Sequence, residues 1–269
     1  MVKKLYKHEF LAWLRIMPLI YGITLVIAAM NRLIMCFETD NIYYNIIQVS
    51  GIIMFGIGLL VCLFAPIVFS VVRYYKNLFT GEGYLTFTLP VSTTAHLWVK
   101  SITALCFSVF SVVAILLSLC VFTAGEVFYE IWLAAVYLLQ KIPADLVWHV
   151  VGWVAEFFVL LLVTVYATHL LYYACISLGQ TFRKNRILSA VGVYFAYYIF
   201  TQICSTAFVI LSVVVAESEL VEKIGMFIFE HPEASVHIGF AISIVAYSIL
   251  CGAFFLISRF VIRKRLNLE

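Results

Sequence analysis

The chain has 269 residues, of which 65% are hydrophobic and only 12% are charged. A soluble domain averages about 45–50% apolar and about 25% charged residues, so this composition excludes an ordinary soluble protein and indicates an integral membrane protein. The formal net charge of +3 is small, but it conceals a strong segregation of basic and acidic residues along the chain.

Residues 1–16 are predicted to form an amphipathic helix. Apolar side chains recur there at spacings of three and four, whereas most of the basic side chains lie elsewhere around the helix. The apolar residues are Val2, Tyr6, Phe10, Trp13 and Met17. A basic helix with an aromatic stripe suits the membrane interface, although an N-terminal extension of the first span explains the same pattern.

Six apolar segments then reach the length of about 20 residues that a helix needs to cross a bilayer. We place the spans at residues 17–37, 46–72, 101–123, 148–178, 187–215 and 236–258. Lipid cannot satisfy exposed backbone groups, and no alternating pattern of about ten residues supports a barrel, so the spans are predicted to be helices. The chain, residues 1–269, is therefore predicted to be a single all-α transmembrane domain.

The distribution of basic residues predicts the orientation of these spans. Fourteen of the 17 Lys and Arg residues fall in the N-terminus, the 73–100 and 179–186 connections and the C-terminal tail. With six spans, these four segments lie on the same side of the membrane. Most acidic residues fall in the other connections. Both termini and the 73–100 connection are thus predicted to be cytoplasmic. The outer connection 216–235 contains an apolar segment, Ile224–Phe229, which suggests partial re-entry into the membrane or lateral packing.

The 73–100 connection is predicted to contain a short helix. Gly81 and Gly83 flank Glu82, a pattern that offers an end to one helix followed at once by an acidic start to the next. Pro90 disfavours helical geometry in the residue before it. We therefore expect about two helical turns between the glycines and the proline.

The side chains of this short helix are too apolar for a free loop. They include Tyr84, Leu85, Phe87 and Leu89. Leaving all four in water would forgo about 6–12 kcal/mol of burial, so the helix is expected to dock on another surface. Ser92 can cap the helix that follows.

No motif of a known catalytic site occurs in the chain. The sequence lacks the GxxxxGK[ST] phosphate loop, HExxH and GxSxG. Glu156 and His169 in the fourth span are about 20 Å apart along one helix, and His149 and Glu156 are about two turns apart, too far to share a metal. We predict no enzyme, no metal and no cofactor bound by this chain. Glu156 remains a candidate, because a membrane-buried carboxylate is costly.

The segment R-Y-Y-K-N-L-F-x-G-E-G-Y-L-x-F-T-L-P-V-S begins at Arg73 and is followed by Lys100 at the head of an apolar helix. This pattern resembles the permeases of the type-2 export family of ATP-binding-cassette (ABC) transporters, as does the layout of six spans with both termini inside. The resemblance implies that the short helix is a coupling helix, which docks into a groove on a separate ATPase subunit. Two permease halves, identical or related, and two ATPases would form the exporter, with ATP and Mg held by the ATPases.

The same resemblance suggests which residues carry the function. The ATPase-coupling residues would be Gly81, Glu82, Gly83, Tyr84, Leu85, Phe87 and Pro90. Spans two and five would line the central cavity, where the candidate residues of a substrate path are Gly51, Phe55, Gly58, Tyr194, Tyr198, Thr201, Gln202 and Ser205. Small and hydroxyl residues also mediate ordinary packing of membrane helices, so packing is the alternative for each of them.

The resulting prediction is the permease subunit of an ATP-driven exporter in a bacterial plasma membrane, surrounded by lipid and without a nucleic-acid partner. Its substrate is expected to be amphipathic or lipid-like, such as a peptide or drug. The alternative position of the short helix is among lipid headgroups, with Arg73 and Lys76 as anchors. One alternative function is that of a non-transporting sensor or immunity protein. An ion-driven carrier is the other alternative, but it would be expected to show broken helices and charges at the midplane.

Overall fold

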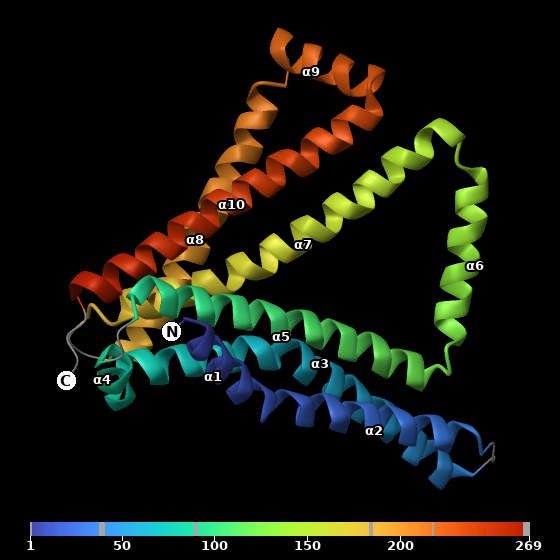
Figure 1. Ribbon diagram of the computed structural model, residues 1–269. Helices are drawn as coiled ribbons and strands as arrows, with labels where there is room; N and C mark the ends of the chain where they lie inside the picture. Colours follow the sequence, from blue (N-terminus) through green and yellow to red (C-terminus); the bar gives the residue numbers. More distant parts are fainter. Residues whose placement is uncertain (1, 38–40, 89–90, 183–184, 217, 266–269) are drawn as a thin grey trace. The chain divides into compact units, whose positions relative to one another are not determined.

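The computed structural model describes residues 2–37, 41–88, 91–182, 185–216 and 218–265. These residues form ten α-helices and no β-strand (Figure 1). The helices are α1 (Val2–Leu14), α2 (Met17–Met35), α3 (Ile42–Phe79), α4 (Gly81–Thr88), α5 (Thr93–Phe122), α6 (Glu126–Lys141), α7 (Ala144–Gly179), α8 (Arg186–Val214), α9 (Glu219–Glu230) and α10 (Pro232–Arg265).

Six helical segments of the described chain are long and apolar enough to cross a membrane. They are Val2–Met35, Ile42–Phe79, Thr93–Phe122, Leu146–Gly179, Arg186–Val214 and Pro232–Arg263. The predicted all-α, multi-pass membrane protein is therefore confirmed. Most of the helices exceed the predicted spans. For example, α3 continues past residue 72 to Phe79, because neither Gly nor Pro interrupts the chain there.

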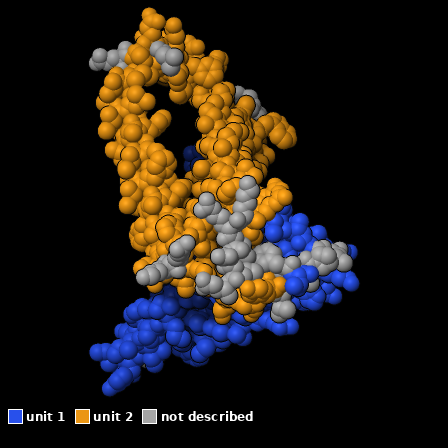
Figure 2. Space-filling model, turned by 90° about the vertical axis from the view of Figure 1, so that its left-hand side faces the viewer, with its two compact units in different colours: residues 1–74, 87–142 blue, residues 75–86, 143–269 orange. Residues whose placement is uncertain are grey.

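The chain divides into two compact units (Figure 2). Unit 1 comprises residues 1–74 and 87–142, and unit 2 comprises residues 75–86 and 143–269. Each unit is described by itself.

In unit 1, α1 and α2 pack against α5. The core of this unit is built on the indole of Trp13, which lies 5.0 Å from the ring of Phe107 and 4.8 Å from that of Phe69, measured between centroids. Met17 and Ala104 are buried beside them. Aromatic residues of the predicted N-terminal stripe therefore pack inside unit 1, whereas Val2 at the start of the stripe is exposed.

In unit 2, α7 packs extensively against α10 and also against α8 (Figure 1). The helices α7 and α10 run in the same direction, because His149 contacts His237 near their starts and Val163 contacts Cys251 further along both. None of the side chains described on α8 is buried. This helix therefore presents a long apolar surface outside the core of unit 2.

Two shorter helices, α6 and α9, connect the long ones. The turn into α6 uses left-handed backbone at Ala124 (φ 51°) and Gly125 (φ 81°), and α6 has no buried residue. Ser218 caps α9, since its side chain accepts a hydrogen bond from the Val221 amide. The connection 216–235, for which partial re-entry was considered, thus contains one helix of 12 residues.

Candidate functional site

The short helix α4 lies between the two longest helices of the first half of the chain. It has eight residues, Gly81–Thr88, and follows α3 after Thr80, whose carbonyl accepts a hydrogen bond from the Gly83 amide at 2.7 Å. This agrees with the helix expected after Gly81.

The start of α5, the helix after α4, also agrees with the prediction from the sequence. Ser92 has extended backbone (φ −66°, ψ 146°), and its side chain accepts a hydrogen bond from the Ala95 amide at the start of α5. The predicted cap is confirmed.

Several residues of α4 are exposed, as expected for a helix that docks on another surface. The Tyr84 side chain is 52% exposed, and Gly81 and Glu82 are exposed as well, whereas Gly83 is buried. The side chains of Leu85 and Phe87 lie outside the described residues, as do Leu89 and Pro90. An exposed aromatic ring on a short helix can contribute a contact to a partner or to lipid.

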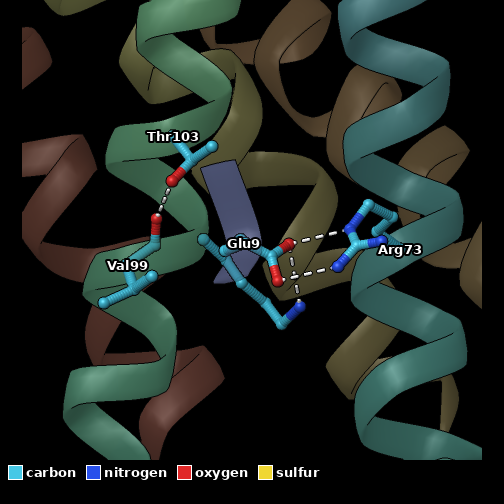
Figure 3. Close-up of polar contacts among 5 residues, drawn as sticks. Glu9, Arg73, Val99 and Thr103 are labelled. Atoms are coloured by element: carbon cyan, nitrogen blue, oxygen red, sulfur yellow. Dashed lines mark hydrogen bonds and ion pairs between the residues drawn. The ribbon is translucent and has the colours of Figure 1, made fainter. Parts of the chain in front are cut away.

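The two helices that flank α4 are joined by a buried ion cluster (Figure 3). Glu9 of α1 accepts two hydrogen bonds from the Arg73 guanidinium, Nε to Oε1 and Nη2 to Oε2, each 2.9 Å long. Lys100 of α5 donates from Nζ to Oε1 at 3.2 Å. Glu9 and Lys100 are buried, with 7% and 5% exposure. One carboxylate thus binds cations from two other helices, and all three residues belong to unit 1.

The geometry of the cluster favours a strong interaction. A bidentate arginine–carboxylate pair adds directional specificity to the attraction of opposite charges. Burial removes each ion from water at a cost of several kcal/mol, which only close, well-directed partners offset. The Arg73 guanidinium also lies 5.7 Å from the centroid of the Phe69 ring, a ring that contacts Trp13. The cluster and the aromatic core of unit 1 are therefore continuous.

The position of the cluster relates it to α4. Arg73 lies six residues before the end of α3, and Lys100 lies seven residues after the start of α5. At 1.5 Å per residue, each cation is about 10 Å along its helix from the end nearest α4. Glu9 therefore holds together the two helices that carry α4, and it does so from a third helix.

The candidate path residues on α3 are in packing contacts within unit 1. The carbonyl of Gly51 accepts a hydrogen bond from Asn31 Nδ2 at 3.0 Å. Phe55 is buried and stacks on Phe122 with 4.6 Å between ring centroids. A Cβ added at Gly58 would lie 3.3 Å from Thr24 Cγ2. The glycines thus allow α2 to approach α3 closely. Such contacts correspond to the alternative in which these residues serve helix packing.

The candidate path residues on α8 are more exposed. Tyr194 stacks on Tyr172 of α7 with 5.7 Å between ring centroids, whereas Tyr198, Gln202 and Ser205 are exposed. The Thr201 hydroxyl donates to the carbonyl of Tyr198 at 2.8 Å. The α8 set therefore retains a polar, accessible face within unit 2.

The candidate residue Glu156 has a histidine partner within unit 2. Its Oε1 lies 2.8 Å from Nδ1 of His237 on α10. Sequence reasoning missed His237, because a pairing between residues 81 positions apart has no local signal.

Sequence reasoning also missed Glu9, although a signal was present. Glu9 lies three residues after Tyr6 and four before Trp13, inside the apolar stripe, where an acidic residue must find a partner when the stripe is buried.

Comparison with protein-family models, with curated proteins and with solved structures gives no match for this chain. The geometry and the sequence therefore carry the functional argument on their own.

The cluster predicts that two Glu→Gln substitutions differ strongly in their effect on the free energy of unfolding. Glu9→Gln removes the carboxylate charge that pairs with Arg73 and Lys100 in the buried cluster and should lower the free energy of unfolding by about 3–5 kcal/mol. The matched control is Glu126→Gln, which breaks the Arg32–Glu126 pair, whose side chains are 35% and 71% exposed, and should cost about 1 kcal/mol or less. Denaturant unfolding in detergent measures both, and equal losses would contradict a strong buried cluster.

Proposed function

We propose that this chain is the membrane-spanning permease subunit of an ATP-driven exporter, with ATP and Mg bound by a separate ATPase. The observation that carries the proposal is the short helix α4, which presents an exposed Tyr84 between two long apolar helices that a buried ion cluster joins. A soluble motor needs an apolar contact on the permease and a stiff connection from that contact into the membrane. The helix α4 and the Glu9 cluster have these two properties.

The proposed orientation follows from the charge distribution. Fourteen of the 17 Lys and Arg residues lie in segments on one side of the six spans, and basic connections stay in the cytoplasm. In this orientation both termini and α4 are cytoplasmic, in the plasma membrane of a bacterium. The contact with the motor would then be made by Gly81, Glu82, Gly83, Tyr84, Leu85, Phe87 and Pro90, in or next to α4.

A second permease half, identical or related, completes the proposed exporter. The exposed apolar face of α8 supports this part of the proposal. Its candidate substrate residues, Tyr198, Thr201, Gln202 and Ser205, offer hydroxyl and amide groups but no charge. A charged solute would lose its hydration there without a partner, so the proposed substrate is amphipathic or lipid-like.

The orientation predicts opposite accessibility of two engineered cysteines. In a background with the seven native cysteines replaced, Gly81→Cys should be protected in intact cells from a membrane-impermeant thiol reagent. Glu219→Cys should react with it. Both positions are exposed, so burial within the chain does not explain a difference. Labelling of Gly81→Cys without labelling of Glu219→Cys would reverse the topology.

If α4 docks on the ATPase, removal of the aromatic rings of α4 should release the ATPase. The affinity-purified chain should carry ATP hydrolysis from the associated ATPase, and the double variant Tyr84→Ala, Phe87→Ala should release it, since a central aromatic contact contributes about 2 kcal/mol or more. Tyr129→Ala on α6, where the ring is 63% exposed, is the matched control and should retain the activity. Full ATP hydrolysis in the double variant would instead favour a helix anchored among lipid headgroups.

A further inference from the structure

Three ionisable side chains of unit 2 form a hydrogen-bonded chain between α7 and α10. Nδ1 of His149 lies 3.1 Å from Nε2 of His237, and Nδ1 of His237 lies 2.8 Å from Oε1 of Glu156. His149 and Glu156 are about two turns apart on α7, so they cannot touch. The imidazole of His237, from the neighbouring helix, bridges that gap.

The space for the bridging imidazole is created by Gly152. A Cβ at this position would lie 2.9 Å from Cε1 of His237, too close for the ring to stay in place. The Trp153 ring flanks the site, with its centroid 5.9 Å from that of His237 and 6.4 Å from that of His149. The backbone of α7 is therefore shaped around the His237 ring at this point.

The three residues differ in their access to the surroundings. His149, near the start of α7, is exposed, whereas the side chains of His237 and Glu156 are 30% and 32% exposed. The second carboxylate oxygen of Glu156, Oε2, is buried and has no hydrogen-bond partner among the described residues. An anionic oxygen without a donor is unfavourable in apolar surroundings.

We propose that His149, His237 and Glu156 form a proton relay that loads Glu156 with a proton from the end of the membrane where α7 begins. Imidazole is suited to this role because it changes its charge near neutral pH and can accept on one nitrogen while it donates from the other. The relay goes beyond the exporter function and does not depend on an ATPase.

The transfer balances without a further reactant. A hydronium ion delivers a proton to Nε2 of His149 and becomes water, and the Nδ1 proton of His149 passes to Nε2 of His237. The Nδ1 proton of His237 then passes to Oε1 of Glu156. Each imidazole ends with one proton, as it began, and Glu156 becomes a neutral carboxylic acid. The reverse sequence returns the proton to water.

Other ionisable residues lie near the starts of both helices. On α7, Asp145 is four residues before His149, and its side chain lies outside the described residues. The nearest acidic residue on α10 is Glu233, one turn before His237, and Glu230 ends the adjoining α9. In the described parts of unit 2, no Lys or Arg side chain forms an ion pair with His149, His237 or Glu156. Among the described residues, the imidazole of His237 is therefore the ionisable partner of Glu156.

Infrared difference spectroscopy of the purified chain in lipid vesicles tests the relay directly. When the protein is acidified, the wild-type spectrum should contain a carboxylic C=O component that is missing from Glu156→Gln, while the components of the other acidic residues remain. Identical carboxylic C=O bands in the wild-type protein and in Glu156→Gln would overturn the proposal.

The route of the proton is tested by the rate at which this band shifts in D₂O. Replacement of the entry residue, His149→Gln, should slow the shift by about tenfold or more, the effect of losing one positioned proton carrier. Gly152→Ala removes no titrating group but displaces the His237 ring, and it should slow the shift as well. Its matched control is Gly239→Ala on α10, where an added Cβ meets nothing within 4 Å. Wild-type rates in both His149→Gln and Gly152→Ala would overturn the relay.

Discussion

The structure of unit 1 depends on one buried carboxylate. Glu9 lies at the meeting point of three helices and binds a guanidinium from α3 and an ammonium from α5. Because an unpaired charge in such a place would cost several kcal/mol, these helices can separate only if the ions first find other partners. The aromatic core around Trp13 packs beside this cluster, so ionic and apolar contacts reinforce the same arrangement of α1, α3 and α5.

The Glu9 cluster lies where it can matter for the proposed function. A hydrogen bond from Asn31 to the carbonyl of Gly51 joins α2 and α3 further along their length. The Glu9 cluster instead acts near the ends of α3 and α5 that carry α4. A helix of eight residues has little stability alone, and its usefulness as a coupling element depends on the stiffness of its supports. In the proposed exporter, a motor bound to α4 would therefore move α3 and α5 as one body, with α1 as the third member.

Local features of this fold were predictable from the sequence, whereas the ionic contacts were not. Apolar length identified the six spans, and the order Gly81, Glu82, Gly83 with Ser92 further on identified α4 and the start of α5, because caps and glycines act on their immediate neighbours. The partners of Glu9 and Glu156 are distant in sequence, so no periodicity reveals them. Phe55 illustrates a further limit: its spacing indicates a helix face, but only the structure shows that Phe122 covers it.

The central claim is that Glu9 holds the ends of α3 and α5 together, and a distance measurement between these helices tests it most directly. Spin labels at Val72 on α3 and Trp98 on α5, which are 40% and 47% exposed, report their separation by pulsed electron paramagnetic resonance in a cysteine-free background. The account predicts one narrow distance distribution when Glu9 is present, a clearly broader one with Glu9→Gln, and no broadening with Glu126→Gln. An unchanged distribution in Glu9→Gln would contradict the claim.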